Sequence, residues 1–220
     1  MQTVPETQLI QFEDWTLRVR ESTPRTDAAR LLLLIHGISG DENSMWVFAR
    51  DLPAHYWIVA PRAPHVFGAG GYSWRPTEGA AMGPPAYEMF LPAAEDLIRL
   101  VDAYSVSARI DASAFDVIGF SQGAAMCNVL AFLYPQRIGK VGILAGFAPG
   151  GLEELVTKRP LRGKPFFVAH GTKDETVTID RARASIALLE QAGAQVTYCE
   201  DEVGHKVSVN CLKALKEFFA

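Results

Sequence analysis

The sequence has 220 residues, of which 49% are hydrophobic and 21% are charged, and its formal net charge is −4 with a pI near 5.7. This balance is typical of an ordinary globular protein, and without a basic patch it gives no reason to expect a nucleic-acid partner. No apolar run approaches the length of a bilayer span and no secretory signal opens the chain, so we expect no stable membrane insertion and a cytoplasmic location.

An α/β chain of this length usually folds as one unit, so residues 1–220 are expected to form a single domain. The three cysteines, Cys127, Cys199 and Cys211, are odd in number and share no metal-ligand spacing. Cys127 lies on a predicted helix, where a buried thiol behaves as a small hydrophobe. We therefore expect no structural disulfide.

The first predicted element is an antiparallel hairpin over residues 8–21, which turns at Glu13-Asp14 and belongs at a sheet edge. The continuous apolar run at residues 31–35 then predicts a central strand that is covered on both faces. Further strands are predicted at residues 56–60, 115–118, 141–147, 166–169 and 195–199.

Helices are predicted between these strands. Asn43 or Ser44 can cap a short helix that Pro53 stops. The other helices are expected at residues 87–106 despite Pro92, after Ser121, near 153–157, at 180–191 with Gly193 as C-cap, and at 207–219. Strands that alternate with helices predict right-handed crossovers and a doubly wound, mostly parallel α/β sheet with helices on both faces.

Residues 61–85 are rich in Gly, Pro and Ala and show no sustained period. This long connection lies at the same sheet edge as Ser121, which makes it the candidate wall of a substrate site. Phe67, Tyr72 and Trp74 are its candidate apolar contacts, and packing of the connection against its own domain is the alternative.

The stretch around Ser121 organises the rest of the chain. An apolar strand runs into Gly119-Phe120-Ser121-Gln122-Gly123, and apolar residues at helical spacing follow. The pattern predicts a tight strand-to-helix turn that lifts the Ser121 hydroxyl above the sheet edge. Glycines flank the serine because a Cβ there would collide with the neighbouring strand and helix. Ser121 is therefore the candidate nucleophile.

A serine hydroxyl needs a base to take its proton and an acid to orient that base. In sheets of this kind the chain order is Ser, then Asp or Glu, then His, each on a loop after a strand. Asp174 and His205 follow the strands at 166–169 and 195–199 in that order. The sequence thus predicts a triad of Ser121, Asp174 and His205 at one sheet edge.

Other residues compete for the two partner roles. The alternatives are Glu175, Asp180 and Asp201 for the acid, and His36, His55, His65 and His170 for the base. Asp174 is preferred because it stands at a strand exit. His205 is preferred because two of the other histidines precede glycine at strand ends, where a ring bonded to backbone is usual, and two come too early in the chain.

Four motifs follow one another over nearly the whole chain, namely His36-Gly37-Ile38-Ser39-Gly40-Asp41, Gly119-Phe120-Ser121-Gln122-Gly123-Ala124, His170-Gly171-Thr172-Lys173-Asp174 and Gly204-His205. Together they resemble the phospholipase/carboxylesterase family of α/β-hydrolases, which includes the acyl-protein thioesterases. The resemblance implies an α/β-hydrolase fold with Ser121 as nucleophile, His205 as general base and acid, and Asp174 as the residue that holds His205. It also implies an oxyanion hole formed by the backbone N–H groups of Ile38 and Gln122.

Two segments depart from the family pattern, and both bear on which substrate is taken. Tyr72-Ser73-Trp74-Arg75-Pro76 stands where members often have Trp-Phe/Tyr-Asp, and Glu175 follows the acid where many have Pro. No metal-ligand spacing occurs, and the glycine-rich stretches 68–71 and 119–123 fit neither a P-loop nor a dinucleotide fingerprint. We therefore expect neither a metal nor a cofactor.

We interpret the chain as a serine carboxylesterase that cleaves small-molecule carboxylic esters or thioesters through an acyl-enzyme on Ser121. Short or medium acyl groups are the first expectation, since 220 residues leave no room for a large lid domain. An acyl-protein thioesterase or a lysophospholipase fits the same motifs, and the resemblance permits a homodimer. The rivals are a binding protein that keeps the hydrolase fold without turnover and a peptidase with the same triad order.

Overall fold

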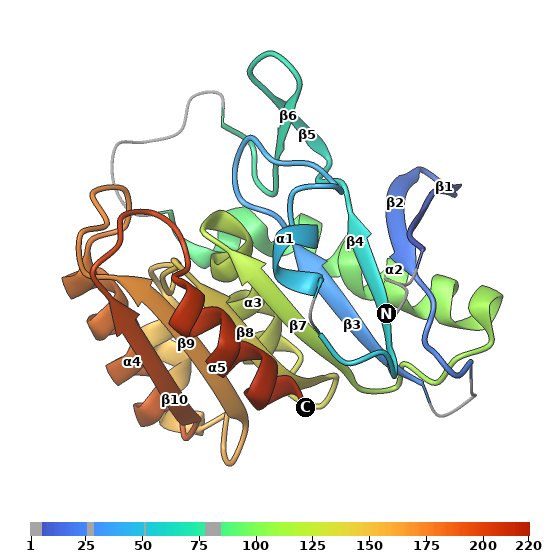
Figure 1. The fold of residues 1–220 in the computed structure, drawn as a ribbon. Helices are drawn as coiled ribbons and strands as arrows, with labels where there is room; N and C mark the ends of the chain where they lie inside the picture. Colours follow the sequence, from blue (N-terminus) through green and yellow to red (C-terminus); the bar gives the residue numbers. More distant parts are fainter. Residues whose placement is uncertain (1–5, 26–28, 51, 78–84) are drawn as a thin grey trace.

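An eight-stranded sheet forms the centre of the computed structural model, which describes residues 6–25, 29–50, 52–77 and 85–220 (Figure 1). Its strands are β1 (Gln8–Phe12), β2 (Trp15–Arg20), β3 (Arg30–Ile35), β4 (Tyr56–Pro61), β7 (Phe115–Phe120), β8 (Ile138–Leu144), β9 (Pro165–Gly171) and β10 (Gln195–Asp201). Their spatial order is β1-β2-β4-β3-β7-β8-β9-β10, and every pairing from β4 to β10 is parallel. The predicted mostly parallel α/β sheet is confirmed, with the predicted antiparallel hairpin at one edge.

Helices cover both faces of the sheet, as predicted. Leu31, Leu33 and Ile35 of β3 pack on one face and Leu32 and Leu34 on the other, because successive strand residues point to opposite sides. The first face is covered by α2 (Leu91–Ala108), α3 (Gln122–Leu133) and α4 (Ile179–Gln191), and the second by α1 (Trp46–Ala49) and α5 (Val209–Phe219). The central strands are thus buried on both sides, and what remains accessible is the edge where the strands end.

Two helices differ from the prediction at their starts. The helix expected from residue 87 begins as a 3-10 turn, Tyr87–Phe90, and becomes α-helical at Leu91, because Pro92 is tolerated only in a first turn. The short helix α1 spans four residues, and Met45, without a side-chain hydrogen bond, is its N-cap. The two residues expected as caps, Asn43 and Ser44, donate to the Asp41 carboxylate instead. The Ser44 hydroxyl donates over 2.9 Å, and the side-chain amide of Asn43 donates over 3.1 Å.

The connection at residues 61–85 carries a hairpin that its composition did not reveal. Strands β5 (His65–Phe67) and β6 (Gly71–Ser73) pair antiparallel around Gly68 and Gly70, which have φ values of +62° and +110°. Residues 78–84 of this connection lie outside the described residues. The 3-10 turn Leu152–Lys158 occupies the other short helical segment that was predicted.

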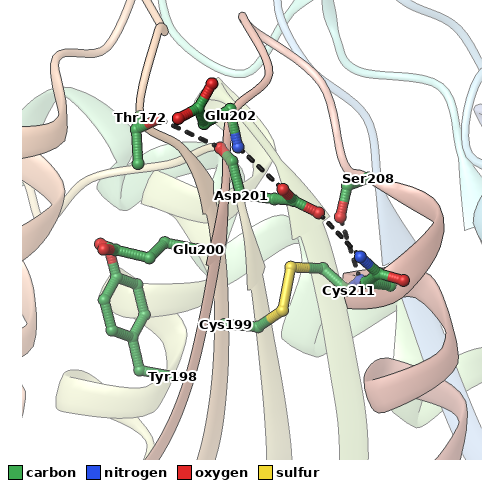
Figure 2. Close-up of a disulfide and its surroundings, with 9 residues drawn as sticks. Thr172, Tyr198, Cys199, Glu200, Asp201, Glu202, Ser208 and Cys211 are labelled. Carbon is green, nitrogen blue, oxygen red and sulfur yellow. Dashed lines mark hydrogen bonds between the residues drawn. A yellow bond between two sulfur atoms is a disulfide. The ribbon is translucent and has the colours of Figure 1, made fainter.

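The prediction of no structural disulfide is wrong. Cys199 of β10 and Cys211 in the first turn of α5 are joined, with their Cα atoms 5.7 Å apart (Figure 2). Counting cysteines missed the pair because α5 folds back over a face of the sheet with its first turn against β10, which brings together two residues that are twelve positions apart. Cys127 is free and fully buried in α3, as predicted, and burial raises the pKa of its thiol well above the usual value.

In the part of the chain that the structure describes, each helix is too short or too polar to cross a membrane.

Candidate active site

Ser121 sits in the sharp turn between β7 and α3. Its backbone has φ +53° and ψ −115°, a conformation that non-glycine residues rarely adopt and that occurs in strained strand-to-helix turns. A Cβ on Gly119 would lie 2.2 Å from the carbonyl oxygen of Gly123, and one on Gly123 would lie 2.0 Å from that of Ile35. The turn therefore needs glycine at both flanks, as expected from the sequence.

The structure brings Ser121, His205 and Asp174 into one hydrogen-bonded chain. The Ser121 Oγ lies 2.9 Å from Nε2 of His205, and Nδ1 of His205 lies 2.7 Å from Oδ2 of Asp174. Each residue follows a different parallel strand, namely β7, β10 and β9, so the three meet at the edge where these strands end. Because Nδ1 faces a carboxylate, it carries the ring proton and leaves Nε2 as acceptor for the serine hydroxyl.

Asp174 is fixed from several sides. Its Oδ1 accepts hydrogen bonds from the backbone N–H groups of Thr176 and Val177, both at 2.9 Å, while Oδ2 faces the imidazole of His205. His170 lies behind it and donates from Nε2 to the Val177 carbonyl oxygen over 2.7 Å. The side chain of Asp174 is fully buried, so its hydrogen bonds are shielded from competing water.

The competing acids and bases occupy other positions. Glu175 is exposed, Asp180 lies in the first turn of α4, and Asp201 accepts hydrogen bonds from Glu202 and Asn210. Among the histidines, His36 and His170 bond backbone groups, as expected from the glycine that follows each, and His65 lies in β5. His205 is thus the histidine that the structure brings to Ser121.

The predicted oxyanion donors flank Ser121. Gln122 follows it at the start of α3, and Ile38 lies in the loop after β3, on the wall of the same hollow as Ser121. Within the described chain, neither backbone N–H donates to another backbone group. Both donors thus remain available to an oxygen placed beside the Ser121 hydroxyl.

A hollow of about 520 Å³ opens at Ser121. Much of its wall is apolar, and the lining residues are Gly37, Ile38, Ser39, Gly40, Ser44, Met45, Val47, Phe48, Phe120, Ser121, Thr176 and His205. The predicted wall at residues 61–85 supplies none of these side chains in its described part. The wall is instead α1 and the loop before it. Tyr72 and Trp74 instead pack against that loop from within the domain. This was the alternative expected for the connection. Trp74 is fully buried and donates to the His36 carbonyl oxygen over 2.8 Å.

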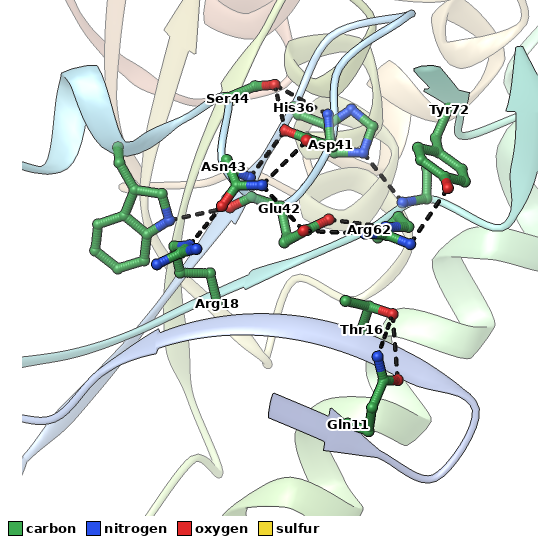
Figure 3. A network of polar contacts seen from close by, with 12 residues as sticks. Gln11, Thr16, Arg18, His36, Asp41, Glu42, Asn43, Ser44, Arg62 and Tyr72 are labelled. Carbon is green, nitrogen blue, oxygen red and sulfur yellow. Dashed lines mark hydrogen bonds and ion pairs between the residues drawn. The ribbon is translucent and has the colours of Figure 1, made fainter. Parts of the chain in front are cut away.

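The loop after β3, here called the β3 loop (residues 36–45), is held by a buried polar network (Figure 3). The carboxylate of Glu42, which is 2% exposed, accepts hydrogen bonds from Arg62 over 2.8 and 3.0 Å. Arg62 also donates to the Tyr72 hydroxyl over 3.2 Å and lies over the Tyr72 ring. Burial alone raises the pKa of Glu42, but the hydrogen bonds from Arg62, a backbone hydrogen bond and the positive charge of Arg62 together outweigh burial and lower that pKa. The carboxylate therefore stays ionised and keeps its hold on Arg62.

The backbone of the β3 loop is tied to β6. The N–H of Ser39 donates to the carbonyl oxygen of Tyr72, and the N–H of Tyr72 donates to the carbonyl oxygen of Gly40, both over 3.0 Å. His36 completes the support: its Nδ1 donates to the Gly37 carbonyl oxygen over 2.7 Å, and its Nε2 accepts from the Ala63 N–H over 3.0 Å. Burial lowers the pKa of His36, so the ring is neutral and can accept at Nε2. These contacts fix the segment that carries the Ile38 N–H.

Sequence reasoning missed Glu42, Arg62 and the side chain of Gln122. The Gln122 carboxamide accepts from the Trp74 N–H over 2.9 Å and donates to the Ser73 hydroxyl over 3.0 Å. It therefore joins the turn between β7 and α3, which carries Ser121, to the end of β6. One sequence signal could have pointed to Arg62, namely that this charged residue directly follows the buried strand β4. Its partner could not be inferred, since twenty residues separate Arg62 from Glu42.

The sequence and the fold are both similar to those of known esterases. The chain is 26% identical to a probable carboxylesterase SOBER1-like of Arabidopsis thaliana over 92% of this chain and 80% of that protein. It is 27% identical to acyl-protein thioesterase 1 of Debaryomyces hansenii over 80% and 82% of the two chains. The carboxylesterase of Bacillus cereus has the same fold, with a TM-score of 0.76 over 94% of both chains at 21% identity.

The model of one protein family covers the elements described above. The phospholipase/carboxylesterase model matches residues 19–220, from β2 through the nucleophile turn to the end of α5. The match includes Ser121, Asp174 and His205, the β3 loop and the strands that support them. This chain belongs to the phospholipase/carboxylesterase family.

Proposed function

We propose that this protein is a serine carboxylesterase with Ser121 as nucleophile, His205 as general base and acid, and Asp174 as the residue that orients His205. The observation that carries the proposal is the continuous hydrogen-bonded chain from the Ser121 hydroxyl through both nitrogens of His205 to the Asp174 carboxylate. A surface serine has no need of a strained turn or of an oriented base.

In the proposed reaction Ser121 Oγ attacks the carbonyl carbon of the substrate while its proton passes to Nε2 of His205. The N–H groups of Ile38 and Gln122 stabilise the oxyanion that forms, and each such donor contributes about 2.7 to 4 kcal/mol to the transition state. His205 then gives the proton to the departing oxygen or sulfur, which leaves an acyl-enzyme. A water molecule then gives its proton to the same nitrogen and attacks the acyl carbon. The bond between the acyl carbon and Ser121 Oγ breaks, the acid leaves, and Nε2 of His205 returns the proton to Ser121. Asp174 stabilises the imidazolium formed in both halves.

The apolar wall of the hollow supports a substrate with a short or medium acyl group. Val47, Phe48 and Phe120 provide apolar surface near Ser121, and no charged side chain lines the hollow within the described residues. An ester and a thioester place the same carbonyl group at the nucleophile, so thioesterase and lysophospholipase activities remain alternatives. The similarity to an acyl-protein thioesterase favours testing thioesters beside esters.

Labelling with a fluorophosphonate tests the proposed nucleophile. An adduct on Ser121 is expected, and Ser121→Ala should lose both the adduct and the hydrolysis of p-nitrophenyl acetate. Ser107→Ala, on the exposed side of α2, is the matched control and should keep both. A correctly folded protein that forms no adduct would support the non-catalytic binding protein instead.

A series of p-nitrophenyl esters and matched thioesters of increasing acyl length tests the substrate class. Activity should fall once the acyl group outgrows the hollow beside α1, and Phe48→Ala should move that cutoff to longer chains. Cleavage of a peptide amide without cleavage of p-nitrophenyl acetate would favour the peptidase.

We also propose that residues 1–220 form a single domain, while a homodimer and a cytoplasmic location stay predictions. The Cys199–Cys211 disulfide bears on the location, because disulfides persist in oxidising compartments and are rare in the cytosol.

A further inference from the structure

The Cys199–Cys211 disulfide closes the chain around His205, which stands midway between the two cysteines in the sequence. One sulfur belongs to β10 and the other to the first turn of α5 (Figure 2). We propose that this disulfide positions the imidazole of His205 for catalysis, so that its reduction lowers the turnover rate. The proposal rests on the proposed function, in which His205 is the general base.

The strand that leads to His205 is weakly held. β10 is the last strand of the sheet, and among the described residues it pairs only with β9; none of its own residues is buried. By contrast β7, which leads to Ser121, is paired on both sides and is buried over most of its length. An edge strand with little buried surface is the kind of element that opens locally in a native protein.

The loop that carries His205, here called the histidine loop (residues 202–208), is anchored mainly in its first half. The N–H of Thr172 donates to the Asp201 carbonyl oxygen over 2.9 Å, and that of Lys173 donates to the Val203 carbonyl oxygen over 3.0 Å. From His205 to Val207, no backbone hydrogen bond reaches another element within the described chain. The second half of the loop therefore depends on the packing of Val207 against the core and on the place where α5 begins.

Two links fix the start of α5 against β10. Asn210 donates to the Asp201 carboxylate over 3.1 Å at the surface, where water competes for the same groups. The disulfide lies beneath it, with Cys211 only 2% exposed. Because the covalent link is the one that water cannot replace, it sets the distance between the two ends of the histidine loop.

The imidazole of His205 tolerates little displacement, since it must reach Asp174 over 2.7 Å and Ser121 over 2.9 Å at once. Reduction by a dithiol breaks the S–S bond: two electrons and two protons pass to the sulfurs of Cys199 and Cys211, and the dithiol becomes a cyclic disulfide. Cys199 is half-buried, so the reductant has a route to it. A misplacement of about 1 Å in such a group can cost about a hundredfold in rate.

The experiment compares the oxidised protein with protein reduced by dithiothreitol and then freed of it under argon, because the thiol itself attacks esters. Reduction should lower kcat for a p-nitrophenyl ester roughly tenfold to a hundredfold with little change in KM. It should also change the pH profile of kcat, because that profile depends on how the general base is held in the complex with substrate. Reoxidation should restore both.

Variants separate positioning from stability. The double variant Cys199→Ala with Cys211→Ala should have the kcat of the reduced protein, and dithiothreitol should not change it further. Cys127→Ala should lose kcat on reduction as the wild type does, since that thiol lies inside α3. A lower melting temperature with unchanged kcat and unchanged pH profile, measured well below melting, would overturn the proposal.

The low-field NMR signal of the proton between His205 and Asp174 gives a readout that does not depend on turnover. It should be sharp in the oxidised protein and broadened or lost on reduction. An oxidised protein with this signal but no esterase activity and no fluorophosphonate adduct would refute the proposed function alone. A signal unchanged by reduction would refute the positioning role.

Discussion

The β3 loop and the histidine loop flank the same residue, the proposed nucleophile Ser121, but are built in different ways. The β3 loop carries the backbone N–H of Ile38, which is the proposed oxyanion donor, and rests on buried side chains, including His36 and Glu42. The histidine loop contributes a side chain, holds no buried residue from 202 to 208, and is tied at its ends by a disulfide. A backbone donor needs the whole loop fixed, whereas an imidazole needs a fixed starting point and two hydrogen-bond partners.

The largest expected effect comes from the histidine loop. His205→Ala should lower kcat by about 10⁶, equivalent to roughly 8 kcal/mol of transition-state stabilisation, because Ser121 would lose its proposed base. The folding free energy should hardly change, since the ring of His205 is partly exposed. Lys206→Ala, in the same loop and exposed, serves as control and should keep the wild-type kcat. A fall of less than about a hundredfold would mean that another group takes the proton.

The next effect breaks the network under the β3 loop. Glu42→Gln keeps the shape of the side chain but removes the charge that Arg62 faces. Removal of one partner from a buried pair costs 3 to 5 kcal/mol, and because the Arg62 side chain is 33% exposed we expect about 1 to 3 kcal/mol. Since the loop carries the proposed oxyanion donor, kcat should also fall roughly tenfold to a hundredfold. Urea unfolding and steady-state kinetics measure the two effects.

The same substitution in the histidine loop is the matched control. Glu202 pairs with Lys173 over 3.0 Å, but the two side chains are 79% and 66% exposed. Glu202→Gln should therefore change stability by less than about 0.5 kcal/mol and leave kcat unchanged. Equal effects of the two substitutions would contradict the contrast between the loops.

A pH dependence follows from the buried ring of His36. Burial lowers the pKa of His36 in the folded state below the ordinary 6.5, so the unfolded chain binds the extra proton first. The contribution of His36 to stability is therefore complete above pH 6.5 and is lost as the pH falls through the lowered pKa, with a slope of at most about 1.4 kcal/mol per pH unit. Urea unfolding across this range should show that His36→Gln has a shallower slope than the wild type. An equal slope would assign the titration to another group.

Patterns of local sequence account for the sheet and its helices. Apolar runs such as Leu31 to Ile35 are covered on both faces, and the chain order of Ser121, Asp174 and His205 led to residues that the structure brings together. Both inferences use short stretches of sequence and the rule that parallel strands end at one edge. Neither requires knowledge of which side chains meet across long separations.

Where long-range packing decides the outcome, the sequence was not sufficient. The Cys199–Cys211 bond depends on where α5 packs, and the ion pair of Glu42 with Arg62 depends on the conformation of the β3 loop. The wall of the hollow was placed at residues 61–85 because that segment is long and irregular. In the described structure its hairpin braces the β3 loop, and α1 forms the wall.

The smallest effect tests how finely the β3 loop is supported. Tyr72→Phe removes only the hydroxyl that accepts from Arg62 over 3.2 Å; the ring under the guanidinium and both backbone bonds to the β3 loop remain. Loss of one such hydrogen bond should cost about 0.5 to 1.5 kcal/mol in urea unfolding and leave kcat within about twofold of wild type.

Tyr72→Leu is the sharper comparison, because it also removes the ring over which Arg62 lies. It should destabilise the protein further and lower kcat if the ring keeps Arg62 directed at Glu42. A Tyr72→Leu protein with the kcat of Tyr72→Phe would show that the backbone bonds of Ser39 and Gly40 to β6 hold the oxyanion donor by themselves. In that case Arg62 would stabilise the fold without positioning the site, and the β3 loop, like the histidine loop, would depend on a few fixed points.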